Sequence, residues 1–155
     1  MSFQNKKKTA FFSGIAVFFI VLDRFLKSLA LNFDGREVDI ISGWLKFNFV
    51  GNYNIALSLP LRGGILIFII IILIMLVVCY FLLSIKKEDL VSAFCMMLIA
   101  LGAISNLIDR MIYGFVIDYF DVRFFSVLNL ADIMITLGVM IFIVFSFYSN
   151  KMKSN

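Results

Sequence analysis

The hydrophobic positions of this chain fall into four long runs separated by shorter polar stretches. The runs cover about residues 9–31, 63–85, 90–108 and 130–148. A helix that crosses a membrane needs roughly 20 consecutive, mostly apolar residues. We therefore predict an all-α membrane protein with four transmembrane helices, organised as one integral membrane domain over residues 1–155.

The composition supports a membrane protein. Hydrophobic residues make up 63% of the chain and charged residues only 15%, whereas soluble domains carry about 25% charged residues. The net charge of +4 is also found in nucleic-acid-binding proteins. Here, however, the lysines flank the apolar runs, as residues that set membrane topology do. We expect membrane lipids around the chain and no nucleic-acid partner.

The lysines predict the orientation of the four spans. They cluster among residues 6–8, 86–87 and 151–153, which lie on one side of the membrane if the spans alternate. Positively charged segments stay in the cytoplasm. We therefore predict that both termini are cytoplasmic and that the connections 32–62 and 110–128 face outward.

The first outer connection contains a second kind of pattern. Between Trp44 and Val50, apolar and polar side chains alternate with a period of two, which is typical of a strand. Gly51 and Asn52 follow as a turn signal. We predict a small β-rich extracytoplasmic region after the first span. The aromatic residues also fit a belt at the membrane interface, and the two interpretations are compatible.

Two aspartates in apolar surroundings, Asp118 and Asp132, are the main candidates for chemistry. Ionisable groups near a membrane are costly and are therefore functional candidates. The chain has no histidine, so Ser-His and Cys-His catalysis are excluded, and paired carboxylates remain as acid and base. Two cysteines, Cys79 and Cys95, do not suffice for a structural zinc site. We predict neither a metal nor a cofactor.

Each aspartate also has a structural explanation. Asn129 and Asp132 have the spacing of a capping box at the start of the fourth span. Asp118 fits a solvated loop position, and Asp121 is a nearby competitor for its role.

Other polar residues change this balance. Asn106 and Arg110 are four residues apart, so they share a helix face at the outer end of the third span. Arg110 either anchors that helix at the interface or helps to hold a polar site inside the bundle. Asp23 and Lys27, also four apart, are interpreted as a structural pair near the outer end of the first span rather than as catalytic residues.

At these residues the chain resembles a known family, the bacterial lipoprotein signal peptidases (signal peptidase II). Four segments carry the resemblance in the right order and spans. Asp23-Arg-Phe-Leu-Lys27 is similar to Asp-x-x-x-Lys, Asn106-Leu-Ile-Asp-Arg110 to Gly-Asn-x-x-Asp-Arg, Gly114-Phe-Val-Ile-Asp-Tyr119 to Gly-x-Val-x-Asp-Phe, and Asn129-Leu-Ala-Asp132 to Asn-x-Ala-Asp.

The resemblance implies an intramembrane aspartyl endopeptidase of the bacterial cytoplasmic membrane, with its active site near the extracytoplasmic face. It implies substrates that are diacylated prolipoproteins, cut just before the lipidated cysteine. The implied catalytic dyad is Asp118 and Asp132. We expect a monomer. The positions expected to support the site or bind substrate are Asn52, Asn106, Arg110, Asn129, Asp23 and Lys27.

The chain also departs from the family pattern. The outer-loop motif Arg-Asn-x-Gly-Ala-Ala is only partly kept, because Gly51, Asn54 and Ile55 differ from it. Ser105 stands where glycine usually precedes the asparagine, and Ser126 where proline is common. These changes affect the predicted fit of the substrate rather than the dyad.

Two other functions stay open from the sequence. The first is a small proton-coupled membrane transporter or channel whose carboxylates line a pathway. It is disfavoured because the carboxylates cluster at one membrane boundary. The second is an inactive family member that binds substrates without cutting them.

Overall fold

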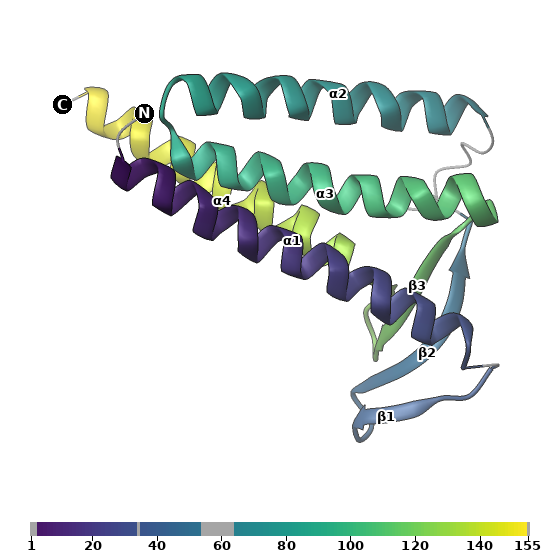
Figure 1. The fold of residues 1–155 in the computed structure, drawn as a ribbon. Coiled ribbons are helices and arrows are strands. Elements are labelled where there is room, and N and C mark those ends of the chain that lie inside the picture. Colours follow the sequence, from purple (N-terminus) through teal and green to yellow (C-terminus); the bar gives the residue numbers. More distant parts are fainter. Residues whose placement is uncertain (1–2, 34, 54–63, 155) are drawn as a thin grey trace.

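A computed structural model of the chain describes residues 3–33, 35–53 and 64–154. The helices are α1 (Phe3–Leu31), α2 (Gly64–Lys86), α3 (Leu90–Tyr113) and α4 (Leu130–Ser154). The strands are β1 (Val38–Ile41), β2 (Leu45–Asn52), β3 (Val116–Val122) and β4 (Val127–Leu128). All four helices are long and apolar enough to cross a membrane. Figure 1 shows the helices running side by side, with the strands gathered at one end. The predicted architecture is therefore confirmed.

The helices run further than the apolar pattern suggested. The third span was expected to end near residue 108, but α3 continues to Tyr113. It ends at Gly114, whose left-handed φ of 80° lets its N–H reach the carbonyl of Arg110. The prediction stopped early because Asp109 and Arg110 are charged. Inside the bundle these charges have partners, so the helix continues through them.

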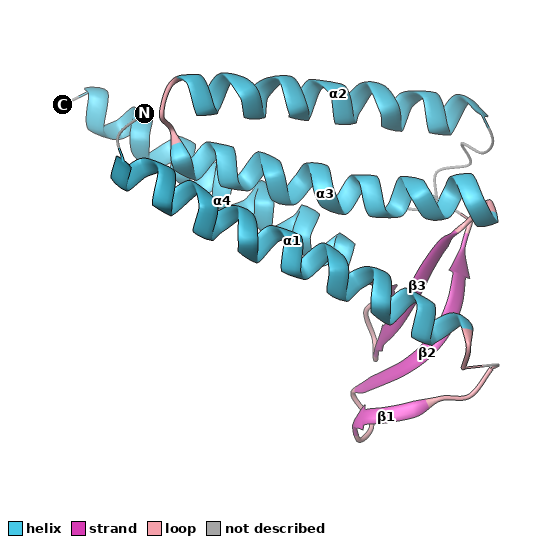
Figure 2. Cartoon of the chain, viewed as in Figure 1, coloured by secondary structure: helices cyan, strands magenta, loops and turns pink. Residues whose placement is uncertain are grey.

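The strands form one antiparallel sheet in the order β1-β2-β3-β4 (Figure 2). The alternation after Trp44 correctly predicted β2. The turn expected at Gly51 and Asn52 was wrong, because these residues continue β2 and pair with Ile117 and Val116 of β3. The second outer connection was not predicted to contribute strands, yet it supplies β3 and β4.

Two glycines bring α3 and α4 into close contact. A Cβ atom at Gly102 would lie 2.6 Å from the carbonyl oxygen of Ala131. A Cβ atom at Gly138 would lie 2.9 Å from the carbonyl oxygen of Cys95. Real Cβ contacts are longer, so the two helices approach this closely only with glycine at both positions. The start of α4 is thereby held against the middle of α3.

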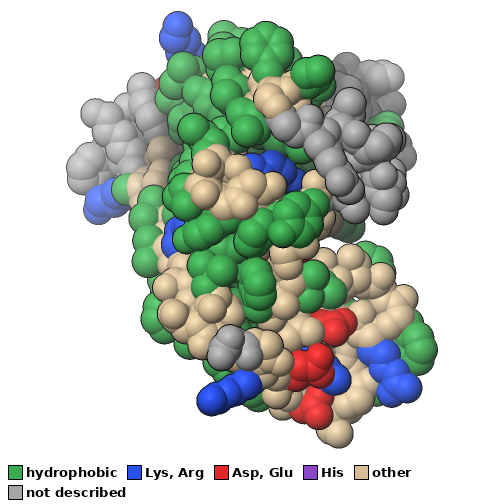
Figure 3. Space-filling model, turned by 90° about the vertical axis from the view of Figure 1, so that its right-hand side faces the viewer, with side chains coloured by type: hydrophobic (Ala, Val, Ile, Leu, Met, Phe, Trp, Pro, Cys, Tyr) green, Lys and Arg blue, Asp and Glu red, His purple; other side chains and the backbone are tan. Residues whose placement is uncertain are grey.

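The sheet packs against the end of α1 through a small apolar core. This core contains Ala30 of α1, Phe47 of β2, and Ile117 and Tyr119 of β3, all buried. Figure 3 looks onto this end of the molecule, where hydrophobic side chains cover the upper part and charged side chains gather below. The junction between helices and sheet is where the polar candidates meet.

Candidate functional site

A buried cluster of charges joins α1 to α3. Asp23, Lys27 and Asp109 are fully buried. The Nζ atom of Lys27 lies 3.1 Å from an Asp23 oxygen and 2.7 Å from an Asp109 oxygen, and Arg24 pairs with the other Asp109 oxygen. The predicted pair of Asp23 and Lys27 is confirmed. Asp109 was not singled out from the sequence, although it completes a cluster with two carboxylates and two cations.

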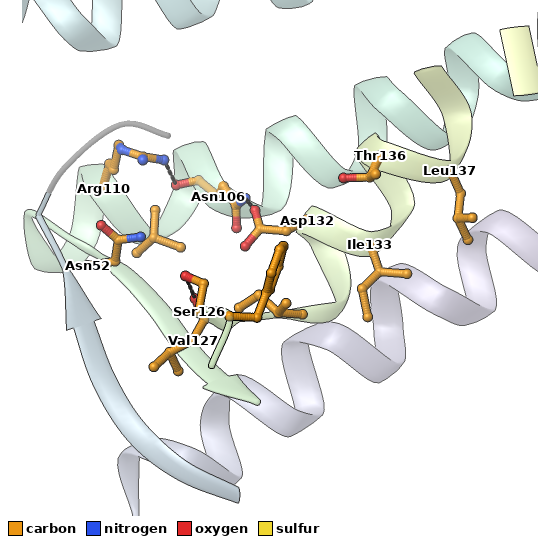
Figure 4. A pocket seen from close by; sticks show the side chains of 12 residues that line it. Asn52, Asn106, Arg110, Ser126, Val127, Asp132, Ile133, Thr136 and Leu137 are labelled. Atoms are coloured by element: carbon orange, nitrogen blue, oxygen red, sulfur yellow. Dashed lines mark hydrogen bonds between the residues drawn. The ribbon is translucent and has the colours of Figure 1, made fainter. Parts of the chain in front are cut away.

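Lys27 also orients the amide of Asn106. Its Nζ donates to Asn106 Oδ1 over 2.8 Å. Because an ammonium group has donors only, the oxygen of this amide must face Lys27. The amide nitrogen therefore faces the opposite way, where it donates to Asp132 Oδ1 over 2.7 Å. Figure 4 shows Asn106 and Asp132 meeting at the wall of a cavity. The buried cluster thus fixes one partner of Asp132.

The start of α4 forms the predicted capping box. The backbone N–H of Asp132 donates to Asn129 Oδ1 over 2.8 Å, and the N–H of Asn129 donates to Asp132 Oδ2 over 3.3 Å. Two further N–H groups of the first turn bond to groups of other elements. Leu130 donates to the hydroxyl of Tyr119 over 3.0 Å, and Ala131 donates to Asp23 Oδ1 over 3.1 Å. The capping role of Asp132 is confirmed, and its carboxylate is held rigidly by that role.

Asp118 is buried in β3, so the interpretation as a solvated loop residue was wrong. Its side chain accepts hydrogen bonds from Asn52 Nδ2 over 2.9 Å and from Asn129 Nδ2 over 2.7 Å. Burial, together with the charge of Asp132, raises the pKa of Asp118 to about 6, against the opposing effect of the two amide bonds. Its competitor Asp121 lies elsewhere in β3.

The free edge of β3 is also completed by side chains. The N–H of Ile117 donates to Asp109 Oδ2, and its carbonyl accepts from Asn129 Nδ2, each over 3.3 Å. Side chains of α3 and of the residue before α4 therefore take the place of another strand here. As a result, the backbone that carries Asp118 is fixed against both helices.

Asn129 links the two aspartates. Its side chain donates to Asp118 and accepts from the N–H of Asp132, and its Nδ2 also contacts Asn106 Oδ1 at 3.2 Å. The ion pairs among the described residues do not include Asp118 or Asp132. Both carboxylates are therefore held by amide groups rather than by cations.

Two cavities adjoin this pair. The first, of about 460 Å³, contains Asp132 in its wall together with Asn106 and Arg110, and the second, of about 550 Å³, contains Asp118. Three residues belong to both walls: Asn52, Ser126 and Val127. Figure 4 shows that the first cavity continues along α4 past the apolar side chains of Ile133 and Leu137. The site is thus polar where the aspartates lie and apolar along the helix.

All eight residues singled out from the sequence lie at this junction. Five of them line the two cavities. The other three are buried and hydrogen-bonded to residues of the site, namely Asp23, Lys27 and Asn129. Asn52 comes from the end of β2, and Arg110 lines the first cavity with its Nη1 3.4 Å from the carbonyl of Asn106. Asn54 and Ile55 of the divergent loop lie outside the described residues. Among the described residues, no group of three or more His, Cys, Asp and Glu side chains is placed to hold a metal ion.

Sequence reasoning missed two buried hydroxyl groups. Ser105 donates to Asp23 Oδ2 over 2.6 Å, and Tyr119 donates to Asp23 Oδ1 over 2.9 Å. The available signal was that both residues differ from the family pattern, which has glycine and phenylalanine at these places.

Comparisons with known proteins point to one family. Residues 15–148 match the family model described as signal peptidase (SPase) II. The chain is 33% identical over 152 residues to the lipoprotein signal peptidase of Lactobacillus johnsonii, covering 95% of this chain and 99% of that one. It is 37% identical over 122 residues to that of Caldicellulosiruptor bescii, covering 78% and 80%. A solved bacterial membrane enzyme shares the fold, with a TM-score of 0.75, 22% identity, and coverage of 91% and 90%.

Proposed function

This chain belongs to the signal peptidase II family and is thus a multi-pass protein of the cell membrane, and we propose that it is an aspartyl peptidase of lipid-modified prolipoproteins. In this proposal it cleaves the bond just before the cysteine that carries the diacylglyceryl group. One observation carries the proposal. Asp118 and Asp132 are linked through Asn129 and contact adjoining cavities, and the salt bridges among the described residues include neither of them.

The two carboxylates would act as a pair that shares one proton. Two nearby carboxylates in surroundings of low dielectric constant do not both ionise easily. The surroundings favour Asp118 as the protonated partner, since burial raises its pKa to about 6. Asp132 lies in the first turn of α4, where the N–H groups and the helix dipole favour a negative charge.

The reaction then follows from general acid and base chemistry. Asp132 takes a proton from a water molecule, whose oxygen attacks the carbonyl carbon of the scissile bond. Asp118 donates its proton to the carbonyl oxygen, which gives a neutral tetrahedral intermediate. When this intermediate collapses, the carbon–nitrogen bond breaks and Asp132 returns a proton to the amine of the departing cysteine. The proton that Asp118 gave to the carbonyl oxygen returns to Asp118 as the new carboxyl group forms, so the pair is regenerated.

The amide side chains would hold this pair in place. Asn52 and Asn129 bond both oxygens of Asp118, and Asn106 bonds one oxygen of Asp132. Preorganised donors of this kind reduce the reorganisation needed during reaction. The apolar wall formed by Ile133 and Leu137 would accept the part of the substrate that lies in the membrane.

We propose that this site faces the outside of the cell and that the chain acts as a monomer, because both carboxylates come from one chain. The two termini and the connection between α2 and α3 lie at the end of the bundle opposite the sheet (Figure 1). The lysine groups therefore gather at one end, as cytoplasmic ends require. Reporter enzymes that are active only in the cytoplasm, fused to either terminus, should both be active.

Mass spectrometry of a diacylated precursor incubated with the purified protein tests the function. We expect two products, a free signal peptide and a fragment that begins with the lipidated cysteine. The same precursor without the lipid serves as the control and should be cut more slowly. Absence of cleavage, or cleavage at another bond, would contradict the proposed function.

A further inference from the structure

The hydroxyl of Tyr119 lies where three elements meet. Tyr119 belongs to β3 and is fully buried. Its hydroxyl donates to Asp23 Oδ1 of α1 over 2.9 Å and accepts from the N–H of Leu130, the first residue of α4, over 3.0 Å. Burial and the charge of Asp23 raise the pKa of Tyr119, so the hydroxyl stays protonated and can make both bonds.

The ring of Tyr119 is held as firmly as its hydroxyl. Its centroid lies 5.5 Å from that of Phe47 and 4.7 Å from that of Phe120. Ala30 and Ile117 complete the same buried cluster. A ring packed on several sides has little freedom to move. The distance from the β3 backbone to the start of α4 is therefore set by a rigid side chain.

Tyr119 and its partner Leu130 lie between the two aspartates in the sequence. Tyr119 follows Asp118 directly, and Leu130 comes two residues before Asp132. The hydroxyl bond thus joins the strand that carries one carboxylate to the helical turn that carries the other. Tyr119 is not among the residues that line either cavity, so its effect on a substrate has to pass through the aspartates.

We propose that Tyr119 is a positioning residue, whose hydroxyl sets the placement of Asp132 on α4 relative to Asp118 on β3. Its kinetic consequence rests on the proposed function. Ser105 carries a second buried hydroxyl, which contacts Asp23 but not α4.

The test compares three substitutions that each remove one hydroxyl. Tyr119→Phe keeps the ring but leaves the Leu130 N–H without its acceptor, which loosens the first turn of α4. We expect kcat to fall on the order of tenfold with KM unchanged, because small displacements of catalytic groups are costly in rate. Ser105→Ala takes a donor from the same Asp23 but spares Leu130, so kcat should fall by less than about twofold. Tyr113→Phe, at an exposed position in the last turn of α3, should leave kcat and KM unchanged.

Hydrogen–deuterium exchange of the same proteins supplies a readout that does not need a substrate. In Tyr119→Phe, peptides that cover the start of α4 should exchange faster, whereas peptides of α2 should be unchanged. Unchanged exchange at the start of α4 would overturn the proposal. A lower melting temperature with wild-type kcat per folded molecule would also overturn it, because Tyr119 would then be merely structural. If the wild-type protein cleaves no precursor, the proposed function fails, and the exchange result still decides whether Tyr119 holds α4.

Discussion

Four buried or half-buried aspartates lie close together at one end of this molecule, in two different kinds of surroundings. Asp23 and Asp109 bond to cations, namely Lys27 and Arg24. Asp118 and Asp132 bond to amide groups, which carry no charge. The residue type and the position in the fold are therefore similar, whereas the balance of charge differs.

The different partners indicate a structural role for the first pair of aspartates and a chemical role for the second. The ion pairs of Asp109 with Lys27 and Arg24 join α3 to α1. Burial raises the pKa of Asp118, whose side-chain partners are amides, to about 6, which lies in the range that acid and base catalysis needs. The first pair fastens α1, α3 and α4 together, and the second pair lies beside the cavities.

Removal of the shared cation is expected to have the largest effect on stability. Lys27→Met leaves the carboxylates of Asp23 and Asp109 without the ammonium group that contacts both. Loss of one partner from a buried ion pair typically costs about 3–5 kcal/mol. We expect the free energy of unfolding in detergent to fall by about that amount. Wild-type stability of this variant would show that the cluster does not hold the bundle.

The pH dependence of stability should single out Asp118. Its pKa is raised from 3.8 to about 6 in the folded protein, so the folded state binds this proton more tightly than the unfolded state does. The stability that the protonated Asp118 contributes to the folded state is fully present below about pH 4 and is lost as the pH rises through about 6. Asp118→Asn lacks the titration. The free energy of unfolding of this variant, relative to that of the wild type, should therefore increase by about 3 kcal/mol between about pH 4 and pH 8. A difference that stays constant with pH would contradict this.

The pH dependence of cleavage should show the same group. Above about pH 6 the pair loses its shared proton. We expect kcat/KM to fall about tenfold for each further pH unit, until product release or another step dominates. The measurement uses one diacylated precursor across a series of buffers of equal ionic strength. A profile that rises through this range would mean that Asp118 acts only as a base.

The smallest effect is expected where an ion pair is exposed. Lys46 pairs with Glu37 at 2.6 Å on the sheet, and both side chains are in contact with solvent. Solvent screens such pairs, so their contribution to stability is small. Lys46→Met is thus a matched control for Lys27→Met, and we expect an unchanged melting temperature. A loss of stability comparable to that of Lys27→Met would show that buried and exposed ion pairs contribute equally to the stability of this protein.

Much of the fold could be predicted from the sequence because hydrophobicity is local information. Runs of apolar residues predicted all four spans, and alternation predicted β2. The pairing that makes β3 a strand is not local, since its partner strand β2 is separated from it in the sequence by α2 and α3. For the same reason Asp109 was passed over, because its partner Arg24 is 85 residues away. The family motifs predicted the dyad, but which aspartates have cations as partners and which have amides could be seen only in the structure.

The different roles of the two pairs of aspartates are tested by comparing one aspartate of each pair by turnover per folded molecule. Asp132→Asn and Asp109→Asn each replace a carboxylate by an amide of the same shape. We expect Asp132→Asn to lower kcat on the order of a thousandfold at nearly wild-type stability. Asp109→Asn should lower the melting temperature but keep kcat within about tenfold. The reverse pattern, with Asp132→Asn active and Asp109→Asn stable but inactive, would contradict a catalytic role for Asp132 and a structural role for Asp109.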